Sequence, residues 1–394
     1  MDRPQIAFIK EGGLPRLKWE YEKERTGWED LLAFGTADMD VACPAPILDA
    51  LKKVLEKGHL GYAMTPDRYF DAIHNWLLRH CGWDVDTRCA VALNVGVYLS
   101  AQSILDILTR PGDRIALLTP VHFCFKRKLN LNGRVPIECP LVEIDGRYTI
   151  DCAALEACFQ SGCRLLWMCN PHNPVGRAWS RQELQKIADL CLRYDVYIMS
   201  DDVYCGLLFP GQRYTPIASL SKEISYRTVT MYSTSKSYNT TGLRHSFILT
   251  ENPELLKRYR EDLDRLDLSY GQSSLGIAAA IAAFEECDPW LEALMEIIAE
   301  HHQLVTEFCR ENLPGAKVAK ADSTYFAWID LRGLGIPPAK LGYLLEQETH
   351  MVVESGIALG KGGAGFIRLN LAIDTALLQE GLKRLQTFWQ RYKR

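Results

Sequence analysis

Residues 233–244 read Ser233-Thr-Ser-Lys236-Ser-Tyr-Asn-Thr-Thr-Gly-Leu-Arg244 and directly follow the β-rich run Thr228–Tyr232. Lys236 is therefore expected just past the end of a buried strand. A lysine among serines and threonines at a strand end cannot easily extend along a helix surface to water, so it needs a partner or a covalent role. Taken alone, however, Lys236 is better explained as a solvated loop lysine, and the rest of the sequence has to decide between the two.

The chain around this segment alternates between strand and helix patterns. From about residue 45 to residue 250, short β-rich runs alternate with helical patterns, which is typical of a sheet with crossover helices. Most of the runs are apolar throughout, as strands buried on both faces should be. We predict an α/β core with strands at Cys89–Leu93, Arg114–Thr119, Arg164–Met168, Val196–Ser200, Thr228–Tyr232 and Ser246–Thr250.

Two helices between these strands carry start signals. Thr65 followed by Pro66 predicts an N-cap and a first-turn proline ahead of a helix over 69–78. Ser180 and Glu183 form a capping-box pattern before a later helix.

The length of 394 residues predicts two cores, because single cores stop growing at about 250–300 residues. After about residue 285 the pattern changes to a second α/β layer, with elements expected at 289–312 (helix), 325–330 (strand), 339–349 (helix), 366–371 (strand) and a terminal helix. We expect a large domain over 46–284 and a small domain formed by 1–45 and 285–394.

Composition and charge argue against several classes of protein. Hydrophobic residues make up 47% of the chain and charged residues 24%, as in an ordinary compact protein. A net charge of −4 without a long block of one sign gives no electrostatic footprint for nucleic acid. The N-terminus lacks a basic region followed by an apolar run, and no window approaches about eighteen consecutive apolar residues. We therefore expect neither export nor a membrane span.

The 13 cysteines are scattered and odd in number, and no two of them form a Cys-x-x-Cys pair. Several lie inside apolar runs, where free cysteine behaves as a small buried hydrophobe. We expect a reduced, cytoplasmic protein without a catalytic cysteine and without a metal site.

A carboxylate also stands at the end of a predicted strand earlier in the chain. Asp201 ends the apolar run Val196–Ser200, at the edge where ligands bind in such sheets. Pyridoxal phosphate requires a lysine, an acid for its pyridine nitrogen and a phosphate site, so Lys236 and Asp201 together suggest this cofactor. Asp202, directly beside Asp201, leaves some ambiguity about which carboxylate would serve.

Two segments could bind the phosphate. The turn around Gly96 and Val97 joins a predicted strand to a helix, where free backbone N–H groups and the helix dipole attract an anion. One glycine before a helix also fits a plain strand-to-helix turn. Ser233, Ser235 and Arg244 could add hydroxyl and charge-assisted hydrogen bonds.

Two further polar residues lie in unusual places. The loop Asn170-Pro-His-Asn173-Pro is too rich in proline for a helix, and Asn173 could donate to the phenolic oxygen of the ring or bond its own turn. Arg368 interrupts an apolar strand, and a buried guanidinium needs an anion. That anion could be a structural carboxylate, which is the commoner case, or the carboxylate of a substrate.

These segments together, in this order, resemble the aminotransferase class I/II family of fold-type I enzymes over nearly the whole chain. The resemblance implies bound pyridoxal 5′-phosphate, a large domain with a mainly parallel seven-stranded sheet, a smaller α/β C-terminal domain, and a homodimer with shared active sites. It implies site roles for Lys236 (covalent cofactor attachment), Asp201 (pyridine nitrogen), Asn173 and Tyr204 (ring oxygen), Gly96, Val97, Ser233, Ser235 and Arg244 (phosphate), Tyr62 (phosphate of the neighbouring subunit), and Arg368, Asn173 and Ala37 (substrate).

Three stretches resemble one branch of this family, the cystathionine β-lyase and cystalysin-like enzymes. They are Thr36-Ala-Asp38-Met-Asp40, Thr324-Tyr-Phe-Ala-Trp328-Ile-Asp330 and Gly365-Phe-Ile-Arg368-Leu-Asn370. The resemblance implies a carbon–sulfur β-lyase that cleaves cystathionine or a related cysteine conjugate.

Departures from the branch favour the alternative, an aminotransferase acting on an amino acid and a 2-oxo acid. Tyr204 and Arg244 stand where this branch usually has histidine and glutamine, and both are found in ordinary aminotransferases. His122 stands where the branch has a tyrosine stacked on the cofactor ring; it could stack, act on the leaving group, or be a surface histidine at a helix start. A third possibility is a non-catalytic cofactor-binding regulator, which the filled catalytic positions argue against.

Overall fold

The computed structural model describes residues 4–9, 12–270 and 272–393. Its largest sheet has seven strands in the order β2-β10-β9-β8-β7-β3-β4. Neighbouring strands from β9 through β4 run parallel, and β10 runs antiparallel to both β9 and β2. The predicted, mainly parallel seven-stranded sheet is therefore confirmed, with strands at β2 (Val91–Asn94), β3 (Arg114–Thr119), β4 (Val135–Pro140), β7 (Leu165–Cys169), β8 (Tyr197–Asp201), β9 (Thr228–Tyr232) and β10 (Ser246–Leu249).

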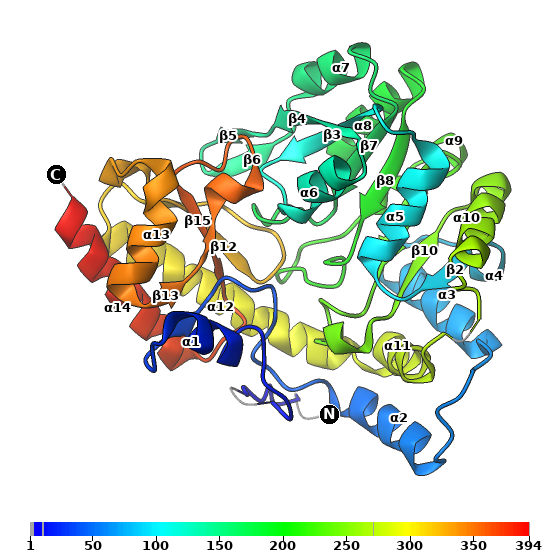
Figure 1. The fold of residues 1–394 in the computed structure, drawn as a ribbon, viewed down its shortest axis with the longest axis horizontal. Coiled ribbons are helices and arrows are strands. Elements are labelled where there is room, and N and C mark those ends of the chain that lie inside the picture. The colour runs from blue at the N-terminus through cyan, green and yellow to red at the C-terminus, as the bar shows by residue number, and fades with distance from the viewer. Residues whose placement is uncertain (1–3, 10–11, 271, 394) are drawn as a thin grey trace.

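Strand β7 shows why these runs are apolar throughout. Trp167 packs into the core on one face of the sheet, whereas Leu166 and Met168 pack into the core on the other. Helices cover both faces (Figure 1). The bounds of the helices up to residue 286 are α1 (Glu20–Thr26), α2 (Ala45–Glu56), α3 (Asp67–Cys81), α4 (Thr87–Ala90), α5 (Val97–Leu108), α6 (Cys124–Leu131), α7 (Cys152–Gln160), α8 (Arg181–Arg193), α9 (Lys222–Ser225), α10 (Pro253–Arg265) and α11 (Ser274–Glu286).

The second layer is a four-stranded sheet in the order β11-β12-β15-β14. The short strand β1 of the N-terminal segment pairs in parallel with β13, and this pairing supports placing the N-terminus with the small domain. The boundaries of the two domains stay a prediction. The elements are β1 (Leu32–Ala33), α12 (Asp288–Asn312), β11 (Lys317–Val318), β12 (Phe326–Asp330), α13 (Pro338–Thr349), β13 (Met351–Val352), β14 (Glu354–Ser355), β15 (Phe366–Asn370) and α14 (Thr375–Tyr392), besides a hairpin of β5 (Val142–Ile144) and β6 (Arg147–Thr149) in the large domain.

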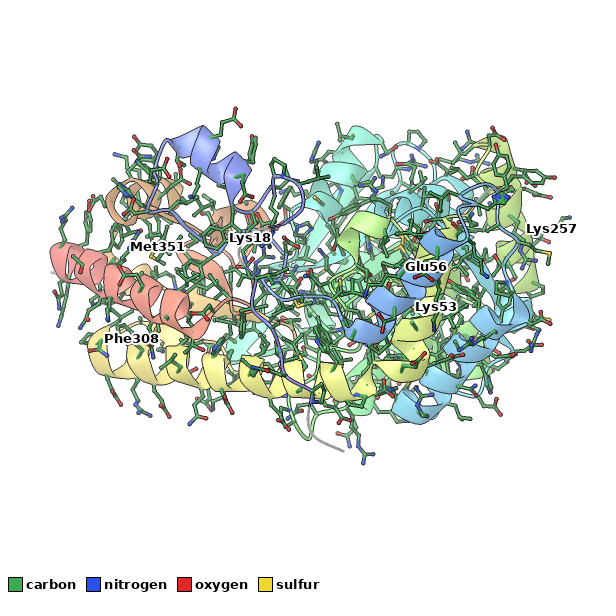
Figure 2. The ribbon with its side chains drawn as sticks, turned by 90° about the horizontal axis from the view of Figure 1, so that it is seen from below. Lys18, Lys53, Glu56, Lys257, Phe308 and Met351 are labelled. Atoms are coloured by element: carbon green, nitrogen blue, oxygen red, sulfur yellow. A yellow bond between two sulfur atoms is a disulfide. The ribbon has the colours of Figure 1, made fainter. Side chains whose placement is uncertain are left out.

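Helix α12 joins the two parts of the molecule. It runs beneath both of them as one continuous helix of 25 residues, drawn in yellow in Figures 1 and 2. The predicted helix over 289–312 is confirmed to within one residue.

Two local predictions were wrong in part. Helix α3 begins at Asp67, so that Pro66 occupies the N-cap position without a side-chain cap, and Thr65 lies outside the helix. Strand β2 begins at Val91, because residues 87–90 form the short helix α4, capped by the side chain of Asp86. The capping box before α8 is confirmed by the reciprocal bonds of Ser180 and Glu183.

The expectation that all cysteines are reduced is wrong for one pair. Cys139 of β4 and Cys158 of α7 form a disulfide, because strand and helix pack together although 19 residues separate the two cysteines. The other 11 cysteines are free. Within the described residues, no helix combines the length and the apolar character needed to cross a membrane.

Candidate active site

A cavity of about 600 Å³ lies where β7, β8 and β9 end and α5 begins. Most of the predicted site residues line it, although they come from separate stretches of the chain. They are Ala37, Gly96, Val97, His122, Asn173, Asp201, Tyr204, Ser233, Ser235, Lys236 and Arg244.

Lys236 follows β9 and reaches the cavity wall. Its Nζ donates a hydrogen bond to the carbonyl oxygen of Ala37 at 2.8 Å. Burial lowers the pKa of Lys236 to about 8, and the charge of Arg368 acts in the same direction, whereas Asp38 and Asp201 oppose it. The amine is therefore neutral at a lower pH than a solvated lysine, as a nucleophile or general base requires.

Asp201 ends β8 and also lines the cavity. Burial raises the pKa of Asp201 to about 7, against the amide of Val203 and the charge of Lys236. Its Oδ1 is buried without a hydrogen-bond partner among the described residues. A buried, unpaired carboxyl oxygen is unfavourable unless a ligand supplies the missing donor.

Asp202, the competing carboxylate, has a different environment. It accepts hydrogen bonds from Ser200 Oγ at 2.5 Å and from the hydroxyl of Tyr214, so both of its oxygens are satisfied inside the protein. It is absent from the cavity wall as far as the described residues define it. Of the two neighbours, Asp201 is therefore the one whose carboxyl oxygen is free to bind a ligand in the cavity.

The predicted phosphate end is only partly free to bind a ligand. Gly96 precedes α5 with φ +132°, but its own N–H donates to Ser246 Oγ at 3.1 Å. The amides that remain for an anion are those of Val97 and Tyr98, because those of Leu99 and Ser100 donate to the Gly96 carbonyl. Ser233 Oγ donates to the carbonyl of His245 at 2.7 Å, so its proton is also engaged.

Arg244 and Ser235 are better placed for this role. Arg244 lines the cavity, and its guanidinium has no hydrogen-bond or ion-pair partner in the part of the chain that the structure describes. Ser235 uses its backbone N–H within the loop, on Ser233 Oγ at 3.1 Å, while its hydroxyl is without a partner among the described residues.

Arg368 is buried beside the cavity rather than on its wall. Its Nη1 donates to Asn173 Oδ1 at 2.9 Å and its Nη2 to the carbonyl of Gly35 at 2.7 Å. The nearest carboxylate, Glu354, is 3.6 Å from Nη2, which is too far for a hydrogen bond. Nε has no partner among the described residues, so the guanidinium is not satisfied by protein alone.

His122 lies on the cavity wall, two residues before α6, and is half-buried. This place on the wall favours a role at the site over the alternative of a plain surface histidine at a helix start. Its Nδ1 lies 3.0 Å from the hydroxyl of Tyr98. Burial lowers the pKa of His122 to about 3, and the charges of Arg368 and Lys236 add to this effect, so the imidazole is neutral.

Tyr62 is a predicted site residue that lies outside this arrangement. Its side chain is 89% exposed and it does not line the cavity. Sequence reasoning also missed wall residues, among them Tyr98, Lys128 and Cys169. Tyr98 could have been found, because it stands in the same turn as Gly96, whereas the other two carry no signal in the sequence.

Comparison with known proteins identifies the family. The sequence pattern described as aminotransferase class I and II matches residues 30–385. The chain belongs to this family. The α/β architecture with its mostly parallel large sheet agrees with that membership.

The relatives include both kinds of enzyme that the sequence suggested. Cystathionine beta-lyase PatB of Bacillus subtilis (strain 168) is 34% identical over 377 residues, which cover 95% of this chain and 96% of the relative. Arginine–pyruvate transaminase AruH of Pseudomonas aeruginosa is 29% identical over 359 residues, covering 91% and 89%. Cystalysin from Treponema denticola, whose crystal structure contains pyridoxal 5′-phosphate, has a TM-score of 0.94 at 30% identity, covering 99% of this chain and 100% of that chain.

Proposed function

We propose that the protein is a pyridoxal 5′-phosphate-dependent carbon–sulfur β-lyase, which cleaves cystathionine or related cysteine S-conjugates to pyruvate, ammonia and a thiol. The observation that carries the proposal is the presence of Lys236 and Asp201 on the wall of one cavity. The similarity to PatB and to cystalysin supports the choice of a lyase within the family.

The residues present fit the cofactor. The unpartnered Oδ1 of Asp201 would accept a hydrogen bond from the protonated pyridine nitrogen. Arg244, Ser235 and the backbone amides of Val97 and Tyr98 at the start of α5 would hold the phosphate. Asn173 and Tyr204, whose side chains approach to 3.5 Å, would donate to the ring oxygen.

When bound, pyridoxal phosphate supplies the electron sink that stabilises negative charge at Cα of the amino acid. Arg368, oriented by Asn173 and Gly35, would hold the carboxylate of the substrate. Lys236 Nζ, as a neutral amine, takes the proton from Cα, and the sulfur then leaves Cβ as a thiolate. The remaining three-carbon fragment is hydrolysed to pyruvate and ammonia, and cystathionine would give homocysteine as the thiol.

The test is a pyruvate assay over a panel of amino acids that carry sulfur at Cβ, each supplied without a keto acid. We expect pyruvate from the wild type and none from Lys236→Ala, because no other amine replaces the base. Lys222→Ala is the matched control, since Lys222 is an exposed lysine paired with Glu251, and it should behave as the wild type. If no conjugate gives pyruvate while turnover requires a keto acid, the lyase proposal is wrong.

An aminotransferase is the second candidate. Tyr204 and Arg244 are the residues of ordinary aminotransferases, and AruH shows similarity over most of the chain. In that reaction Lys236 would return the proton to the cofactor instead of allowing a thiolate to leave. The same assay distinguishes the two, because only the lyase releases pyruvate from a single substrate.

We also propose a homodimer with shared active sites. Large apolar side chains are exposed near the isolated bridge between Ala63 and Gln272, and such a patch is typical of an interface. They are Leu60, Tyr62, Met64 and Tyr270, with exposed fractions of 60%, 89%, 89% and 83%. Tyr62 would then reach the phosphate of the neighbouring subunit. A cytoplasmic location is part of the same proposal, and the 11 free cysteines support it.

A further inference from the structure

Lys18 is fully buried, although it lies in the N-terminal segment and does not line the cavity. Its Nζ donates to the carbonyl oxygen of Asp38 at 3.0 Å and pairs with Asp40 Oδ2 at 2.9 Å. Arg16 Nη2 pairs with the side-chain carboxylates of both residues, at 2.8 Å from Asp38 and 2.6 Å from Asp40. Figure 2 shows Lys18 between the two parts of the molecule.

The partners of Lys18 belong to residues 36–40. This segment also accepts hydrogen bonds from β15 of the smaller sheet and from the loop that follows β9 of the larger sheet. Asn370 Nδ2 of β15 donates to two carbonyl oxygens of this segment at 2.8 Å and 2.7 Å. Asn239 Nδ2, three residues after the lysine of the cavity, donates to a third at 3.2 Å. The backbone of segment 36–40 is therefore fixed from several directions. On the N-terminal side, Arg16 holds the Met39 carbonyl, and Lys18 is the buried lysine that holds the Asp38 carbonyl.

Segment 36–40 carries the contact that reaches Lys236. The carbonyl of Ala37 accepts the hydrogen bond from Lys236 Nζ at 2.8 Å. Ala37 and Asp38 are neighbours in the chain, and the carbonyl oxygen of Asp38 accepts a hydrogen bond from Lys18 Nζ. A shift of the segment would therefore move the acceptor that orients the reactive amine.

We propose that Lys18 is a positioning residue for Lys236: the Lys18–Asp40 pair fixes segment 36–40, and the Ala37 carbonyl then aims Nζ into the cavity. The inference rests on the cofactor in the proposed function, and it does not depend on the reaction being a lyase reaction. A buried ion pair adds little net stability by itself, because desolvation offsets much of the attraction. A role in orientation explains why a lysine is buried here.

The step to measure is the covalent attachment of pyridoxal 5′-phosphate to the cofactor-free protein. The neutral amine of Lys236 gives its lone pair to the aldehyde carbon, a carbon–nitrogen double bond replaces the carbon–oxygen bond, and the oxygen leaves as water with both amine protons. The rate is followed by visible absorbance. Binding of pyridoxine 5′-phosphate, which lacks the aldehyde, is measured separately by calorimetry.

Three variants make the experiment specific. Lys18→Met removes the charge and the donor, and Lys18→Gln keeps an amide donor for Asp38 or Asp40. Arg25→Met is the matched control, because Arg25 also ties the N-terminal segment down but pairs with Glu22 and with Glu346 of α13.

We expect attachment to slow about tenfold in Lys18→Met, because small displacements of a reacting group are costly. Lys18→Gln should fall between Lys18→Met and the wild type, and Arg25→Met should match the wild type. Both Lys18 variants should bind pyridoxine 5′-phosphate with the wild-type Kd, because only the amine is displaced.

An unchanged attachment rate in Lys18→Met would overturn the inference. Equal losses in attachment and in pyridoxine 5′-phosphate affinity would overturn it as well, since the site would then be generally damaged. If Lys18→Met does not fold, the attachment rate and the pyridoxine 5′-phosphate affinity of Lys18→Gln test the inference in the same way. A wild type that attaches no cofactor would instead refute the proposed function, and this inference with it.

Discussion

Asp201 links the chemistry of the cavity to the stability of the cofactor-free protein. Its pKa rises from an ordinary value of 3.8 to about 7 on folding, so the native state binds more protons than the unfolded state between these values. The contribution of Asp201 to stability is therefore complete below the lower value, and it is lost as the pH rises through about 7. A buried carboxylate then remains, and the nearby charge of Lys236 offsets only part of the cost of its burial.

Asp201→Asn should remove this loss in the cofactor-free protein. We expect the Tm of the variant to rise relative to the Tm of the wild type as the pH increases from about 5 to about 8, because the amide cannot ionise. Thermal unfolding at several pH values measures the difference. Asp189→Asn, at an exposed aspartate that accepts from Gln185, is the control and should show a constant difference. A constant difference for Asp201→Asn would contradict the pKa.

Single residues were predictable where a local pattern places them at a strand end. Asp201 ends β8 and Lys236 lies shortly after the end of β9, so their meeting at one edge of the sheet follows from the topology. Lys18 was not predictable, because its burial depends on contacts with residues 20 and 22 positions away. Ser246 was missed for a similar reason: its bond to Gly96 exists only because β10 inserts beside β2.

The turn into α5 is the element on which the phosphate site depends. Gly96 has φ +132°, a conformation that side-chain-bearing residues rarely adopt, although a Cβ would meet no atom within 4 Å. Gly96→Ala should therefore act through backbone strain alone and reduce the free energy of unfolding by about 1–3 kcal/mol. Urea denaturation of the cofactor-free protein measures the effect.

The same substitution should weaken the binding of pyridoxine 5′-phosphate, because the first turn of α5 moves with the strained residue. Gly13→Ala is the matched control, since a Cβ there also meets nothing within 4 Å and the backbone carries no positive φ. Equal stabilities for Gly96→Ala and the wild type would show that the turn relaxes without strain.

Strands and helices were predictable wherever apolar runs were continuous. Six of the seven strands of the large sheet were located to within two residues, whereas β4 was missed. Strand β4 contains Pro136 and Pro140, which argue against a strand in the middle of a sheet but are tolerated at its edge. Its position at the edge is a property of the sheet order and cannot be read from the strand itself.

At the scale of the assembly, the exposed Tyr62 allows a direct test of shared active sites. Lys236→Ala and Tyr62→Ala subunits should each be impaired as pure dimers. A mixture should recover about a quarter of the wild-type pyruvate release, because half of the dimers are hybrids and each hybrid has one intact site. Light scattering confirms the dimer in each sample.

Tyr343→Ala is the control, because Tyr343 is a similarly exposed tyrosine on α13, with an exposed fraction of 67%. It should be fully active before mixing. Failure of the first mixture to recover activity, although hybrids form, would mean that Tyr62 serves no neighbouring site.

The unbroken α12 limits how the two parts of the molecule can move against each other. A hinge requires a short segment whose backbone dihedral angles change, yet α12 contains no glycine and has its one proline at the first turn. Any closure over the cavity must therefore bend α12 gradually along its length or rotate the smaller part of the molecule about the axis of this helix. The entrance should accordingly narrow by small amounts, and substrates will be selected more by the fixed shape of the walls than by a large swing of the smaller part.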